Sequence, residues 1–134
     1  MKIVIIGCGR VGSKLACQLA HEGNDVAVID RNPLAFDKLQ NNLAVNMIVG
    51  TGIDEDVMIN AGVKDADAVI SVAKGDNTNI MAGQIAKFLF NVPKVIVRIV
   101  DPKSKKFYED ELGLTCYCPT EVSSNNYLKI LGGI

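Results

Sequence analysis

Short apolar segments alternate along the chain with longer segments in which apolar residues recur every three or four positions. The short segments are rich in β-branched residues, as buried parallel strands are, and they cover residues 2–6, 25–30, 44–49, 66–72, 94–100 and 115–118. A helical pattern follows each one, at residues 11–22, 33–42, 54–61, 76–91, 102–112 and 120–131. Six strand–helix units predict one α/β domain over residues 1–134, with a Rossmann-like, doubly wound, six-stranded parallel sheet and helices on both faces.

Polar residues at the starts of these helical segments predict where the helices begin. Asn32 precedes Pro33, and Asp54, Asp76 and Thr120 precede later apolar repeats. Short side chains with an oxygen accept hydrogen bonds from the first free amides of a helix. We therefore expect these residues to cap their helices, with Pro33 in the first helical position.

The composition and charge of the chain argue against several classes of protein. A net charge of −1 does not fit a non-specific nucleic-acid binder, so no nucleic-acid partner is expected. No apolar run reaches the roughly 20 residues that span a bilayer, and the longest candidate contains Lys94 and Arg98. The cysteines at 8, 17, 116 and 118 show no secretory spacing, which favours the cytoplasm. Two thiolates alone make a poor zinc site, so no structural metal is expected.

The strongest chemical motif follows the first strand. Gly7, Cys8, Gly9, Arg10, Val11 and Gly12 fit the pattern G-x-G-x-x-G and lead into a helix. In that context Gly7 permits a tight turn, Gly9 lets a phosphate approach the backbone, and Gly12 lets helix and strand pack closely. Free amides at the helix start would bind the anion. The alternative is a glycine turn that binds nothing.

An acidic residue at the end of the second strand supports a dinucleotide. Asp30 lies 18 residues after Gly12 (30 − 12), close to the spacing of the ribose-binding acid. Its carboxylate would accept from ribose hydroxyls and repel a 2′-phosphate, which favours NAD over NADP. Arg31 follows directly and would weaken that exclusion. The alternative reading of Asp30 is a solvated loop carboxylate.

Arg10 adds a full positive charge at the partly positive start of the first helix. A guanidinium there suits a chain of phosphates, or a phosphate shared with a neighbouring subunit. The alternative is an exposed arginine at a helix end.

Further candidates follow the other strands. Gly50, Thr51 and Gly52 follow the third strand, where two glycines would let a flat ring such as adenine approach the backbone. Ala73 and Lys74 follow the fourth strand, and Lys74 could reach a phosphate. Arg98 interrupts the fifth strand, where it either forms a structural ion pair or faces the ligand.

Catalytic groups are harder to find than binding groups. His21 is the sole histidine, and it falls late in the first helix, away from the predicted strand ends. No Ser/His/Asp set is present, and no second domain is left to hold a substrate. We therefore expect no enzyme. An NAD-dependent oxidoreductase fragment without its substrate domain, and an assembly domain with an empty pocket, are the alternatives.

Several stretches together resemble one family. They are "VIIGCGRVGSKLA", "VAVIDRNP", "GTGIDEDVMINAGVKDADAVISV", "GDNTNIMAGQIAK", "PKVIVRIVDP" and "LGLTCYCPTE". They resemble the N-terminal lobe of domains that regulate potassium conductance, called RCK, KTN or TrkA-N domains. The resemblance implies that Arg10 reaches a terminal phosphate, Asp30 binds ribose, Arg98 lies near the ligand and Glu121 lies near the ligand or an ion. Thr51 departs from the family, in which an aspartate is common.

The resemblance also implies a function and partners. It implies a cytoplasmic module at the inner face of the membrane that binds NAD/NADH or ATP/ADP, with AMP possible, and controls a potassium channel or uptake transporter. It further implies a homodimer or ring-like oligomer, and a C-terminal RCK lobe that this chain does not contain. The last helix, with its apolar residues from 127 to 134, would then pack on a partner.

Overall fold

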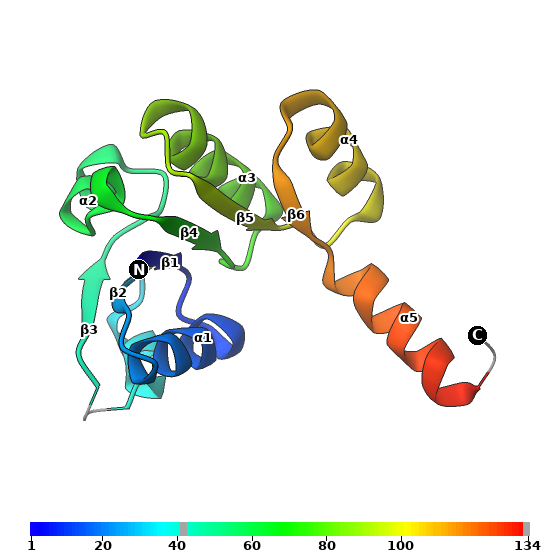
Figure 1. The fold of residues 1–134 in the computed structure, drawn as a ribbon, viewed down its shortest axis with the longest axis horizontal. Helices are drawn as coiled ribbons and strands as arrows, with labels where there is room; N and C mark the ends of the chain where they lie inside the picture. Colours follow the sequence, from blue (N-terminus) through cyan, green and yellow to red (C-terminus); the bar gives the residue numbers. More distant parts are fainter. Residues whose placement is uncertain (41–42, 133–134) are drawn as a thin grey trace.

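The computed structural model describes residues 1–40 and 43–132, and within them the chain forms one parallel sheet with helices on both faces (Figure 1). The strands are β1 (Lys2–Ile6), β2 (Asp25–Asp30), β3 (Val45–Val49), β4 (Ala68–Ser71), β5 (Lys94–Arg98) and β6 (Thr115–Tyr117). Their order is β3-β2-β1-β4-β5-β6, and every neighbouring pair is parallel. The predicted Rossmann-like fold is confirmed, and the order reverses between β1 and β4.

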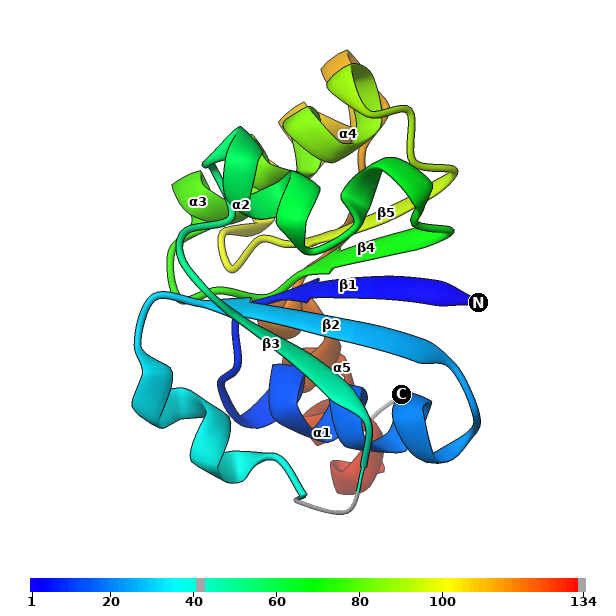
Figure 2. The same cartoon turned by 90° about the vertical axis from the view of Figure 1, so that its left-hand side faces the viewer.

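Helices divide between the two faces of this sheet, as Figure 2 shows. One face carries α1 (Arg10–His21) and the 3-10 helix η1 (Pro33–Lys38). The other carries α2 (Glu55–Asn60), the short 3-10 turn η2 (Val63–Asp65), α3 (Asp76–Gln84) and α4 (Pro102–Leu112). The last helix, α5 (Pro119–Leu131), leaves the sheet after β6.

Alternating side chains of the central strands fill two apolar layers. Val4 and Ile29 belong to the layer under α2 and α3, whereas Ile3 and Val28 belong to the layer under α1. All four are at most 2% exposed. Because β1 and β2 are apolar on both faces, they form the rigid centre from which the loops at the strand ends project.

Two predicted helices differ in their form. The segment after Asn32 is a 3-10 helix that ends at Lys38, although Asn32 caps it as expected, through its bond from the Leu34 amide. The predicted end at 42 lies outside the described residues. The helix predicted for 76–91 is α-helical only to Gln84 and continues as a π-helical turn (Ile85–Leu89).

Two predicted caps are wrong. Cys118, not Thr120, is the N-cap of α5, because Pro119 occupies its first turn and Thr120 lies inside the helix. Gly75, not Asp76, is the N-cap of α3 and offers no side-chain bond. Thr120 and Asp76 instead bond to the chain after β5, as described below. Asp54 does cap α2, since it accepts from the amides of Asp56 and Val57.

Helix α5 points away from the body of the domain (Figure 1). None of its residues, all of which are described, is buried. Its apolar side chains are largely open to solvent, including Tyr127 at 72%, Ile130 at 84% and Leu131 at 81% exposure. The helix therefore does not dock on its own sheet. None of the helices in the described residues combines the length and the apolar character that a bilayer crossing requires.

Candidate functional site

The residues predicted to bind a ligand lie at or directly after the carboxyl ends of β1 to β5, except Glu121, which follows β6. Parallel strands end at the same edge of a sheet, so the loops after these strands form one rim. The rim includes the switch point, where the chain after β1 and the chain after β4 leave on opposite faces. Gly7 and Ala73 meet there: a side chain built on Gly7 would lie 2.7 Å from the Ala73 nitrogen.

Gly7 and Gly12 are structural requirements of the glycine loop. Gly7 has a φ of +103°, which L-residues rarely adopt, and its amide donates to the Ile29 carbonyl at 2.8 Å. A Cβ on Gly12 would lie 1.9 Å from the Gly7 carbonyl oxygen. Because neither position has room, these two glycines fix how β1 turns into α1.

Gly9 is different, because a Cβ there would meet nothing within 4 Å. It is the N-cap of α1, and no side chain caps the amides that follow it. Arg10 and Val11 begin the helix and are exposed. Open space beside free amides at a helix start suits a phosphate. Arg10 adds its charge at this same end of α1.

Asp30 holds the glycine loop in place. Its Oδ2 accepts from the amide of Cys8 at 2.8 Å, and its Oδ1 accepts from the amide of Asn32 at 2.9 Å. Each carboxylate oxygen has a further lone pair, so the group can still accept from ribose hydroxyls. The neighbouring Arg31 is exposed. The carboxylate thus joins β1's loop to β2's end.

The loop after β3 brings two glycines close to side chains of the core. A Cβ on Gly52 would lie 2.4 Å from the Ile6 side chain, and one on Gly50 would lie 2.6 Å from that of Val57. Gly52 is buried and Thr51 is partly buried. These glycines are explained by close packing, and whether an adenine also uses the loop stays a prediction.

Arg98 joins the loops after β4 and β5. Its Nη2 donates to the Ala73 carbonyl at 2.7 Å. An ion pair with a carboxylate, which was one of the two alternatives for Arg98, does not form among the described residues. Its Nε is buried and has no partner there, and an unpaired buried donor is costly. That N–H group could donate to an oxygen atom of a ligand. Lys74, which follows Ala73, is exposed.

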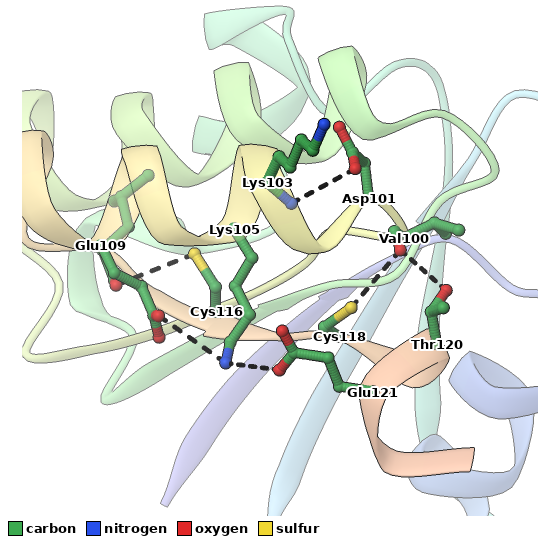
Figure 3. Close-up of polar contacts among 10 residues, drawn as sticks. Val100, Asp101, Lys103, Lys105, Glu109, Cys116, Cys118, Thr120 and Glu121 are labelled. Atoms are coloured by element: carbon green, nitrogen blue, oxygen red, sulfur yellow. Dashed lines mark hydrogen bonds and ion pairs between the residues drawn. The ribbon is translucent and has the colours of Figure 1, made fainter. Parts of the chain in front are cut away.

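Glu121 lies in the first turn of α5 and pairs with α4. Its Oε2 lies 3.0 Å from the Nζ of Lys105, which also lies 3.7 Å from Glu109 (Figure 3). The hydrogen bond that Lys105 donates to Glu121 raises the pKa of Lys105. Glu121 thus forms a contact within the chain, and its expected contact with a ligand or an ion stays a prediction.

Cys8 and Cys118 are buried, and Cys17 and Cys116 are partly buried against the core. Burial, and then the charge of Asp30, raise the pKa of Cys8, whose thiol donates to the Ala35 carbonyl at 3.4 Å. Burial also raises the pKa of Cys116, to about 11. Across residues 1–40 and 43–132, no group of three His, Cys, Asp or Glu side chains could hold a metal.

Asn79 and Asp76 are site residues that the sequence did not identify. Asn79 is fully buried, accepts from the Ser71 hydroxyl and the Ala73 amide, and donates to the Ala73 and Arg98 carbonyls. Asp76 accepts from the Val100 amide. The motif "GDNTN" contains both, but only the fold shows which loops they join.

Comparison with known proteins supports the family that the motifs suggested. A family model described as the TrkA-N domain matches residues 3–116. The Trk system potassium uptake protein TrkA of Streptomyces coelicolor is 40% identical over 131 residues, which are 98% of this chain and 58% of that protein. The chain thus spans a little over half the length of this relative.

Two solved structures share the fold. The AMP-bound form of the Kef CTD from Shewanella denitrificans matches with a TM-score of 0.81 and 22% identity, over 98% of this chain and 82% of that chain. The TrkA-N domain of the inner membrane protein ybaL from Escherichia coli matches with a TM-score of 0.85 and 21% identity, over 97% and 96%. The family match covers most of the chain, and the chain belongs to the TrkA-N domain family.

Proposed function

We propose that this chain is a sensing module that binds an adenine nucleotide at the rim and controls a potassium transporter or channel. The observation that carries the proposal is the open space at Gly9, beside uncapped amides of α1 and the carboxylate of Asp30. Rossmann sheets bind nucleotides at this switch point. An AMP-bound structure of the same fold supports the ligand class.

Different residues of the rim would bind different parts of the nucleotide. The amides after Gly9 would bind the phosphate next to the ribose, and Arg10 would bind the phosphates beyond it. Asp30 would accept from the ribose hydroxyls. The unpaired Nε of Arg98 would donate to a ligand oxygen, with Lys74 at the outer margin. NAD/NADH and ATP/ADP both carry the phosphates and the ribose that these residues would bind. AMP carries the ribose and a single phosphate, so it would use a part of the site.

The names of the relatives support the proposed control of potassium transport. These relatives are named as Trk system potassium uptake proteins. A regulator of this kind would lie at the inner face of the membrane and assemble as a homodimer or ring. The exposed apolar face of α5 supports assembly. A ligand controls such an assembly only if it binds two arrangements with different affinity.

An oxidoreductase fragment remains the second candidate for the same fold. Hydride transfer to a carbonyl or from an alcohol is accompanied by proton transfer, for which an acid or a base lies beside the ligand. The sole histidine, His21, ends α1 about 16 Å along the helix from Arg10, so it does not supply that base at the rim.

Calorimetric titration tests the binding claim. We expect the purified chain to bind at least one of AMP, ADP, ATP, NAD⁺ and NADH with a dissociation constant below 1 mM, in the range of about 1–100 μM for a site with several charged contacts. If none of the five nucleotides binds at millimolar concentration, the proposed function is wrong.

A further inference from the structure

The backbone of Val100 forms hydrogen bonds with two parts of the molecule that are far apart in sequence. Its amide donates to both carboxylate oxygens of Asp76, at 3.0 and 3.1 Å. Its carbonyl accepts from the Thr120 hydroxyl at 2.8 Å and from the Cys118 thiol at 3.3 Å. Figure 3 shows Cys118 and Thr120 converging on this carbonyl. One residue therefore joins the start of α3 to the start of α5.

On the side of the candidate site, Val100 belongs to a firmly bonded pair of loops. Arg98 donates to the carbonyl of Ala73 at 2.7 Å, and Asn79 bonds to the backbone of both residues. Asp76 also accepts from the Asp101 amide at 3.4 Å. The loop after β4 and the chain after β5 are thus tied at successive points. A displacement of one loop by a ligand would displace the other.

On the other side, Val100 is part of the attachment of α5. Within the described residues, the side-chain hydrogen bonds and ion pairs that join this helix to the body come from Cys118, Thr120 and Glu121. Residues 122–131 of α5 are exposed. Because the polar contacts found in residues 1–40 and 43–132 hold the helix at its first turn, a small shift of that turn changes the direction of the whole helix.

We infer that the Val100 backbone is the joint through which occupancy of the nucleotide rim is transmitted to α5. This inference rests on the proposed function for its ligand, but the joint itself is a property of the protein without ligand. A ligand that seats against Ala73 favours one position of the loop pair. The hydrogen bonds of Asp76 make Val100 shift with the loop pair, and the hydrogen bond of Thr120 makes the first turn of α5 shift with Val100. Asp76 and Thr120 are positioning residues, which need not touch the nucleotide.

Hydrogen exchange of α5 amides tests the joint without any nucleotide. Thr120→Val removes the hydroxyl and keeps the shape, whereas Thr120→Ser keeps the hydroxyl. We expect millisecond exchange of residues 123–131 to be about fivefold faster in Thr120→Val, the effect of one hydrogen bond, and unchanged in Thr120→Ser. Asp76→Ala removes the bond on the far side of Val100, so it should also speed exchange in α5, by at least twofold.

The matched control for Asp76 is Asp54→Ala, which removes a capping carboxylate from α2 on the same rim. It should leave exchange in α5 unchanged. If Asp76→Ala also leaves α5 unchanged, or if Asp54→Ala speeds α5 equally, the joint is refuted whether or not any nucleotide binds.

A second arm adds AMP or NADH at saturation. The inference predicts that the nucleotide changes exchange in α5 of the wild type, and that Thr120→Val binds the same nucleotide within twofold of wild type but loses at least half of that change. A full response in a Thr120→Val protein that still binds would refute transmission through Val100. If calorimetry shows no binding to the wild type, the proposed function fails, and the ligand-free arm still decides whether the joint exists.

Discussion

The Asp30 carboxylate lies 2.8 Å from the amide nitrogen of Cys8, so the acid of the second strand fixes the glycine loop of the first. The amide belongs to a residue with no solvent exposure. Asp30 therefore supports the binding loop in the absence of ligand, in addition to any contact with ribose. Its two roles can be separated by substitution.

Asp30→Ala should weaken both stability and binding. It leaves the Cys8 amide without an acceptor, which costs about 1–3 kcal/mol in the free energy of unfolding, and it should weaken nucleotide binding at least tenfold. Asp30→Asn keeps one acceptor oxygen, so it should lose less stability and bind NADP better relative to NAD. Urea denaturation and calorimetry measure the two effects. An Asp30→Ala protein as stable as wild type would contradict the support role.

Gly9 and Gly12 form a matched pair. Gly12→Ala places a Cβ 1.9 Å from the Gly7 carbonyl oxygen, so we expect a loss of about 3 kcal/mol or more in the free energy of unfolding. Gly9→Ala meets nothing within 4 Å and should change stability by less than about 1 kcal/mol. It should nevertheless weaken nucleotide binding at least tenfold, because the methyl group occupies the space of the phosphate. Normal binding by Gly9→Ala would place the ligand elsewhere.

Arg10→Ala should discriminate nucleotides by their phosphates. A charged hydrogen bond contributes about 1.5–3 kcal/mol, so ATP binding should weaken at least tenfold and AMP binding less than threefold. Lys14→Ala is the control, because Lys14 lies one turn further along the same helix and is exposed. It should change neither affinity by more than about twofold, because Lys14 lies beyond the first turn of α1, where the free amides would bind the phosphate. Equal weakening of all nucleotides by Arg10→Ala would exclude a role in counting phosphates.

The apolar face of α5 should support self-association. Ile130 and Leu131 are more than four-fifths exposed, and a surface of this kind is typical of an interface. Sedimentation should show dimers or larger assemblies of the wild type at micromolar concentration, and mostly monomers after Ile130→Glu with Leu131→Glu. Asn126→Glu adds charge to the same helix without removing an apolar group, so it should remain assembled. A wild-type chain that is monomeric at 100 μM (on the order of a weak dimer's dissociation constant) would oppose this prediction.

The sequence predicts the sheet well because its strands are apolar on both faces, as β1 shows, and glycines mark the turn after it. Helix starts were harder to predict. Thr120 looks like a cap, but Pro119 before it favours the first helical turn and moves the cap to Cys118. Helix η1 begins correctly at its asparagine cap and is nonetheless a 3-10 helix, a difference that periodicity does not resolve.

Partners across the sheet were not predictable from local sequence. Arg98 is an evident anomaly in an apolar strand, yet its partner is the Ala73 carbonyl, 25 residues away. Asn79 resembles any polar residue of a first helical turn until the fold buries it between two loops. Such contacts depend on strand register and on the path of the loops, which no short pattern encodes.

The structure of a complex with AMP or NADH, determined from crystals at saturating nucleotide, tests the proposed site most directly. We expect a phosphate against the amides that follow Gly9, and ribose hydroxyls within hydrogen-bonding distance of the Asp30 carboxylate. A nucleotide bound elsewhere on the molecule, with an unoccupied and fully ordered rim at Gly9 and Asp30, would contradict the proposed site.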